Sequence, residues 1–256
     1  MKMNTSIKLS ALAVLLAGML LSACQKNDSH DNPLKIQYTI GPYQSSKISG
    51  TVDFTEVLHT DSVQLTIQLT GVSQDGSYPV LLRKGTSIEN GEVAFNLGFV
   101  DGRNPTLTKT IPLPFSQLIK YNGCLDIYRN PNDTVTIVAQ SEIGANNIFK
   151  SYDMSNPITT QPNGQFRIYK RDAGAYIVVR IDSASAHLGG MPHPTRVYTA
   201  EGAREFELED LSEVSGVSAT LVTDHSFDDL THSNYVIKVL QSEDLQDVVL
   251  SQGAVK

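Results

Sequence analysis

The chain has 256 residues, of which 40% are hydrophobic and 18% are charged, and its formal net charge at pH 7 is −7. An acidic chain of this kind lacks the basic face that nucleic acid requires, so we expect no nucleic-acid partner. With 2 cysteines in the whole sequence, we expect the fold to be held together by apolar cores and not by disulfides.

The first residues have the pattern of a secretory signal peptide. Lys2 and Lys8 precede the apolar run 11–21, which is too short to span a bilayer. Leu21-Ser-Ala-Cys24 follows, and small residues before a cysteine resemble the lipobox of bacterial lipoproteins. The resemblance implies a lipoprotein signal peptide at 1–23, acyl chains such as palmitate on Cys24, and attachment to a membrane through lipid. The alternative is an ordinary secretory signal in which Cys24 is incidental.

Residues 24–33 are polar and rich in turn formers, which predicts a flexible tether between the lipid and the first folded unit. A protein with this beginning is expected in the bacterial cell envelope. We place it on the outer membrane, at either the periplasmic face or the cell surface.

From residue 34 onward, apolar and polar residues alternate with a period of two, the pattern of strands with one buried face. Ile48–Phe54, Val63–Leu69 and Gly91–Leu97 are clear examples. Helical periodicity is scarce and allows about one turn at Pro114–Ile119 and at Phe227–Leu230. The sequence therefore predicts an all-β fold, with hairpin turns at Leu58–Asp61 and Asn132–Thr134.

The two halves of the chain resemble each other at a spacing of 111 to 113 residues. When Val63–Lys84 is aligned with Tyr176–Val197, several residues of the turn and the strand agree. The matched residues are Gly76 with Gly189, Pro79 with Pro192, and Arg83 with Arg196. We therefore predict a tandem duplication, with units at 34–150 and 151–256 and a turn-rich linker at 151–157.

Each half carries a glycine-proline turn, a G-x-x-x-F-x-L strand (91–97 and 202–208), and a last strand that contains Ala-Gln (139–140) or Ser-Gln (251–252). This arrangement resembles the chordin-type (CHRD) domain, which is itself similar to copper/zinc superoxide dismutase. The resemblance implies two Greek-key β-sandwiches, or flattened barrels, of seven or eight strands each.

In that family the turn is commonly followed by His-x-His, and a later strand carries another histidine that completes a copper or zinc site. Here Leu81-Leu82-Arg83 and Pro194-Thr195-Arg196 stand at the His-x-His position. The later position holds Tyr128 in the first half and Val239 or Leu240 in the second. None of these side chains can replace an imidazole, so we expect no metal cofactor there and a closed site with Leu81 or Leu82 buried.

Four other histidines could form a different site: His187, His193, His225 and His232. A metal needs three or four converging ligands, so the simpler interpretation is that they are solvated loop side chains. The alternative is a copper- or zinc-binding protein that uses these four residues. His30 and His59 are expected to be exposed, and Cys124 is expected to be a buried thiol.

Arg83 and Arg196 match in the alignment, which predicts a recurring salt bridge at the end of each sandwich; anion capture is the alternative. The sequence contains no G-x-S-x-G, no phosphate-binding glycine loop and no H-E-x-x-H. These observations favour a non-catalytic, membrane-anchored envelope lipoprotein without cofactor, acting as a binding or structural module for an unknown envelope protein or glycan. A surface adhesin or glycan-binding subunit is a further alternative.

Overall fold

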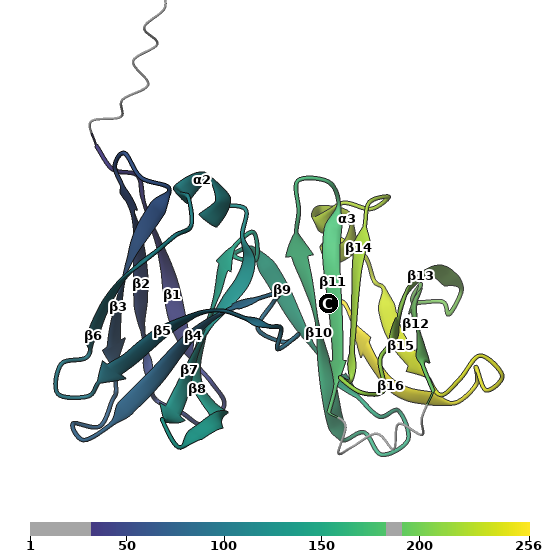
Figure 1. Cartoon of the computed structure of the whole chain (residues 1–256). Helices are drawn as coiled ribbons and strands as arrows, with labels where there is room; N and C mark the ends of the chain where they lie inside the picture. The colour runs from purple at the N-terminus through teal and green to yellow at the C-terminus, as the bar shows by residue number, and fades with distance from the viewer. Residues whose placement is uncertain (1–31, 183–190) are drawn as a thin grey trace, which may run out of the picture. The chain divides into compact units, whose positions relative to one another are not determined.

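The computed structural model of this chain describes residues 32–182 and 191–256. The expected signal peptide, Cys24, His30, His187 and Gly189 lie outside the described residues. Leu34–Lys256 form one compact unit, which contains two antiparallel sheets of eight strands each (Figure 1). The all-β prediction is confirmed. A membrane-spanning helix is not found among the residues that the structure describes.

The first sheet contains the strands that precede residue 145, with one short helix between its sixth and seventh strands. These elements are β1 (Lys35–Pro42), β2 (Ser49–Val57), β3 (Ser62–Thr70), β4 (Ser77–Lys84), β5 (Val93–Asp101), β6 (Thr106–Ile111), α2 (Phe115–Leu118), β7 (Asn122–Asn130) and β8 (Asp133–Gly144).

The second sheet repeats this sequence of elements. It contains β9 (Phe149–Ser155), β10 (Pro162–Lys170), β11 (Ala175–Ile181), β12 (His193–Tyr198), β13 (Arg204–Leu211), β14 (Val217–Val222), α3 (Phe227–His232), β15 (Val236–Leu240) and β16 (Val249–Ala254).

The two sheets have the same strand order. The first runs β5-β4-β7-β8-β1-β2-β3-β6, and the second runs β13-β12-β15-β16-β9-β10-β11-β14, so each strand has a counterpart eight positions later. In each sheet the two end strands also lie next to each other, which curls the sheet into a barrel-like β-sandwich. The expected pair of tandem β-sandwiches is therefore confirmed.

The expected linker at 151–157 is wrong, because most of it is strand β9. Met154 points inward from this strand and is fully buried in the core of the second sandwich. The connection between the sandwiches is the shorter turn at 145–148. Asparagine and proline near the end of the segment do form a turn, but it follows β9 and leads to β10.

The alignment of Val63 with Tyr176 is wrong by one residue. Val63 pairs with buried Ile111, and the inward residue at the same place in the second sheet is Ala175, which pairs with buried Val222. A strand that shifts by one residue exchanges its two faces. The mismatch arises because Ala175–Val179 is apolar on both faces and therefore does not show which face is the core.

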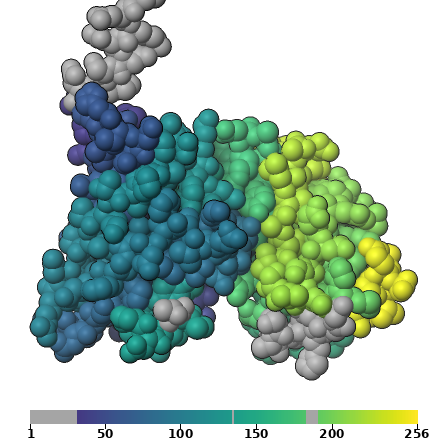
Figure 2. Space-filling view, viewed as in Figure 1, coloured from purple at the N-terminus to yellow at the C-terminus, as the bar shows by residue number. Residues whose placement is uncertain are grey.

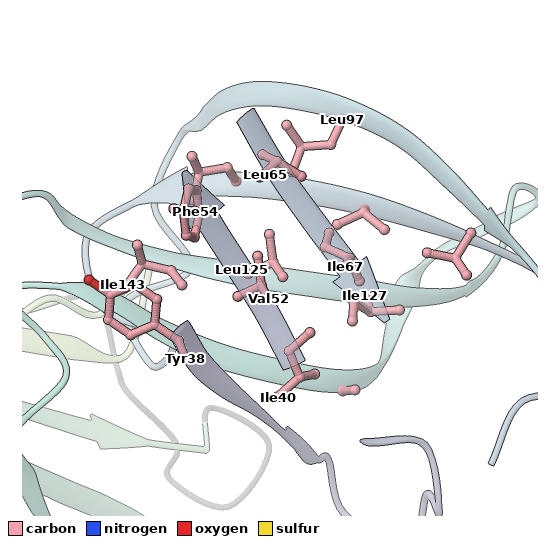
Figure 3. Close-up of a cluster of buried hydrophobic side chains, with 14 of the residues drawn as sticks. Tyr38, Ile40, Val52, Phe54, Leu65, Ile67, Leu97, Leu125, Ile127 and Ile143 are labelled. Atoms are coloured by element: carbon pink, nitrogen blue, oxygen red, sulfur yellow. The ribbon is translucent and has the colours of Figure 1, made fainter. Parts of the chain in front are cut away.

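The core of the first sandwich is formed by aliphatic side chains and Phe54 from facing strands. Side chains of β1, β2, β3, β5, β7 and β8 point toward one another there (Figure 3). Tyr38 meets Phe54 edge to face at 5.9 Å between ring centroids. The second sandwich has its own core, in which Tyr152 stacks on Phe166 at 4.7 Å. Each β-unit therefore buries its own apolar face.

The expected hairpin turn at Leu58–Asp61 is confirmed, and a second hairpin turn lies at Pro131–Asn132, slightly earlier than the expected Asn132–Thr134, because Asp133 and Thr134 already belong to β8. Val57 pairs with Ser62 across the Leu58–Asp61 turn, where His59 is exposed and has a φ of 62°. Asn130 pairs with Asp133 across the second turn, and the Asn132 backbone N–H donates to the Asn130 side-chain oxygen at 2.9 Å.

Strand β4 offers a matched test of which face is the core. Leu82 is fully buried and Leu81, next to it, points outward and is half-buried. We expect Leu82→Ala to lower the free energy of unfolding by about 2–5 kcal/mol, because it leaves a cavity, and Leu81→Ala to cost clearly less. Urea unfolding of both variants measures the difference. Equal losses would contradict this assignment of the core face.

Candidate functional site

The strand register decides which residues of β4 and β12 correspond. Leu82 pairs with Phe95, and Val197 pairs with Phe206; both phenylalanines belong to the G-x-x-x-F-x-L strand. Leu82 and Val197 are therefore counterparts. It follows that Arg83 corresponds to Tyr198 and that Arg196 corresponds to Leu81. The alignment of Arg83 with Arg196 is wrong by two residues, so the two arginines do not share a recurring position.

Arg83 belongs to a polar network on the outer face of the first sandwich. Its Nε lies 3.0 Å from Asp126 Oδ2, its Nη2 donates to Tyr128 Oη at 2.8 Å, and its Nη1 donates to the Gly91 carbonyl at 2.7 Å. The Asp126 carboxylate, 2% exposed, also accepts from Gln140 Nε2 at 2.8 Å. Burial raises the pKa of Asp126, although the bonds from Gln140 and Arg83 act in the opposite direction.

Arg196 lies in a different environment. Its side chain is 4% exposed, and its Nη2 lies 2.6 Å from Glu243 Oε2. Its Nε is 3.6 Å from Glu207 Oε1, while its Nη1 has no hydrogen-bond partner. Each arginine thus makes an ion pair, but with partners on different strands and loops.

The histidines proposed as alternative metal ligands are held by separate local contacts. His193 was expected in a solvated loop; that expectation is wrong, because it begins β12, is buried, and places Nδ1 2.8 Å from the Gln241 carbonyl oxygen. His225 stacks on Phe206 at 4.9 Å, and His232 Nδ1 lies 2.7 Å from the Asp228 carbonyl oxygen of its own helix. Within 32–182 and 191–256, no three His, Cys, Asp or Glu side chains gather as metal ligands.

Cys124 is a free and fully buried cysteine, as expected. It lies in β7 between Arg83 of β4 and Glu142 of β8. Burial raises the pKa of its thiol well above the ordinary value, and the nearby Asp126 and Glu142 carboxylates raise it further. The thiolate, which is the nucleophilic form, is therefore disfavoured.

The most elaborate polar cluster includes a buried carboxylate that sequence reasoning missed. Glu142 of β8 is 6% exposed at its side chain. Its Oε1 accepts from Ser87 Oγ at 2.7 Å, from Arg167 Nη1 at 2.8 Å and from Tyr169 Oη at 3.0 Å. The Ser87 backbone N–H also donates to Oε1, at 3.1 Å. Ser87 and Glu142 belong to the first β-unit and Arg167 and Tyr169 to the second, so one carboxylate joins the two units.

Further contacts surround this carboxylate. Ile88, in the loop that follows β4, packs with buried Tyr169 and Val178 of the second β-unit. Glu89 Oε1 accepts from Tyr176 Oη at 2.8 Å. The atoms of the two units are in direct contact (Figure 2). These contacts cover the outward faces of β10 and β11, which explains why β11 is apolar on both faces.

Within residues 32–182 and 191–256, the carboxylate of this junction has no counterpart in the second unit. Glu142 pairs with Cys124, and the corresponding pair in the second unit is Ala254 with Val236. The place of the buried carboxylate is therefore taken by a methyl group in the second unit. The signal that could have revealed the junction is Ala175–Val179, whose consecutive apolar residues indicate a strand covered on both sides.

The sequence matches no protein-family model, and no curated protein is significantly similar to it. Any assignment of function therefore depends on the residues and contacts described above.

Breaking the buried pair should uncouple the two units and destabilise the chain. We expect Glu142→Ala and Arg167→Ala each to lower the free energy of unfolding by about 3–5 kcal/mol, because each leaves an uncompensated buried charge. The loss of unfolding free energy in the double variant should be smaller than the sum of the two single losses by at least about 1 kcal/mol. Urea unfolding measures all three. The matched control is Arg103→Ala: its pair with Asp75 is 77% and 85% exposed and should contribute only about 0–1 kcal/mol. Additive losses would show that the two charges do not interact.

The junction should also make stability depend on pH. Burial raises the pKa of Glu142, against the opposing bonds from Ser87 and Arg167. A raised folded pKa contributes stability that is full below the unfolded value and is lost as pH rises through the folded value. We therefore expect the stability of the wild type relative to Glu142→Gln to fall as pH rises above about 4, the ordinary pKa of a glutamate. Chemical unfolding at several pH values measures this difference, and a constant difference would refute the shift.

Proposed function

We propose that this protein is a non-catalytic lipoprotein of the bacterial cell envelope, anchored through acyl chains on Cys24. In this proposal, its two chordin-type β-units act together as one binding or structural module for an envelope protein or glycan. The proposed location is the outer membrane, at either the periplasmic face or the cell surface.

The single observation that supports one module made of both units is the junction at Glu142. A buried carboxylate with donors from both units is costly to separate, because each group would lose its partners. Two β-sandwiches joined in this way present their loops at fixed positions, which suits a protein that binds or spaces other molecules. The lipid anchor is supported by the lysines, apolar run and Leu21-Ser-Ala-Cys24 of the sequence.

The absence of catalysis is supported by the residues at the positions where metal-binding chordin-type domains carry histidine. Leu81 is an aliphatic residue that points outward from β4, and Arg83 is bonded to Asp126 and Tyr128. In the second unit, Arg196 is bonded to Glu243. An aliphatic side chain and two protonated guanidinium groups offer no electron pair to a cation.

Lipid attachment can be tested directly in cells that express the full chain. We expect metabolic labelling with an alkyne-tagged palmitate to mark the wild-type protein. We also expect cell fractionation to recover this protein in the membrane fraction. Cys24→Ser should lose both the label and the membrane association, because it removes the acylated thiol.

The second cysteine provides the matched control. Cys124→Ala removes a buried thiol and should keep both the label and the membrane association. A wild-type protein without label, or a Cys24→Ser protein that retains it, would refute the proposed anchor.

A further inference from the structure

An open cleft lies beside the junction, where the turn 145–148 connects the two β-units. It has a volume of about 860 Å³. The first unit contributes Ile119 and Lys120, which follow α2, together with Ile148 of the connecting turn. The second unit contributes Lys170, Arg171 and Leu221.

The cleft is basic although the chain is acidic. Lys120, Lys170 and Arg171 line it, together with one carboxylate, Asp172. Among the described residues, none of these three cations takes part in an ion pair. Three cations facing one carboxylate leave an excess of positive charge around one concave surface, even though Glu89 and Glu142 also act on the charge of Arg171. Such a surface attracts an anion more strongly than separate surface lysines do.

Arg171 is fixed in place by neutral groups. Its Nη1 donates to the Ala145 carbonyl at 2.7 Å, and its Nη2 donates to Asn146 Oδ1 at 2.7 Å. Its guanidinium carbon lies 5.0 Å from the centroid of the Tyr176 ring. These contacts hold the guanidinium without cancelling its charge, so the cleft keeps a preorganised cation.

The cleft also gathers exposed aliphatic side chains. Ile119 is 45% exposed, Ile148 is 53% exposed and Leu221 is 56% exposed. Large aliphatic side chains that collect in one concave site, instead of being scattered singly, mark a binding surface. A ligand that covered them would need an apolar part next to its charged part.

We propose that this cleft binds an amphiphilic anion, namely a carboxylate or phosphate carried on an apolar chain. The anion lies among Lys120, Lys170 and Arg171, and the apolar chain covers Ile119, Ile148 and Leu221. A small inorganic anion would leave the aliphatic groups in water, and a cationic amphiphile would be repelled. This inference does not depend on lipid attachment at Cys24.

The test uses the protein from Gln25 to Lys256, which contains the whole compact unit Leu34–Lys256 and needs no detergent. Decyl phosphate, decanoate, decyltrimethylammonium and inorganic phosphate are each titrated by isothermal calorimetry at concentrations below micelle formation. We expect saturable binding of the first two, and binding of the last two that is weaker by at least about tenfold. The relative affinities of decyl phosphate and decanoate show which headgroup the site prefers.

Charge reversal in the cleft identifies the site. Lys170→Glu should weaken binding of the decyl anions by about tenfold. Leu221→Asn, which replaces an exposed aliphatic side chain of the cleft, should also weaken their binding. Lys109→Glu, which reverses an exposed charge on β6 outside the cleft, should leave it unchanged. The proposal is overturned if the wild type shows no saturable binding, if decyltrimethylammonium binds equally well, or if Lys109→Glu weakens binding as much as Lys170→Glu.

Discussion

The carboxylate of Glu142 is the constraint on which the relation between the two β-units depends. A carboxylate removed from water must recover its lost solvation from nearby donors, and Glu142 does so with Ser87 of its own unit and Arg167 and Tyr169 of the other. The loop after β4 must therefore reach β10, and the outward faces of β10 and β11 must be apolar or able to bond. The outward face of β11 meets the apolar part of this requirement, because its Val178 packs against Ile88 of the loop after β4.

The two β-units agree in their inward faces and differ in their outward ones. Strand order and core positions agree between the units, but the outer-face network of Arg83, Asp126 and Tyr128 is replaced by Tyr198, Lys238 and Leu240. Lys238 Nζ now lies 4.6 Å from the Tyr198 ring centroid. Core residues must interlock with many neighbours at once, whereas an outer-face pair can change together without altering the fold.

The same junction also leaves a cleft that neither unit would form alone. Its cations are Lys120, which follows α2, Lys170 at the end of β10 and Arg171 in the β10–β11 turn. Its aliphatic side chains come from both units. A buried, hydrogen-bonded junction next to an open, basic and partly apolar cleft is compatible with the proposed binding module. The proposed lipid anchor would keep such a module close to a membrane.

The sequence by itself determined the all-β class and the presence of hairpin turns near Leu58–Asp61 and near Asn132, because strand alternation and turn residues are local patterns. It also indicated two similar halves, although the residues matched between β4 and β12 were not the true counterparts. The tertiary structure alone decided that the places of Arg83 and Arg196 within their β-units differ by two residues. It likewise decided that His193 is buried and that strand β9 occupies most of the expected linker. It also decided that Glu142 meets Arg167. Register and outer-face burial depend on contacts between residues far apart in the chain, and a strand covered on both sides, such as β11, carries no alternation from which its register could be read.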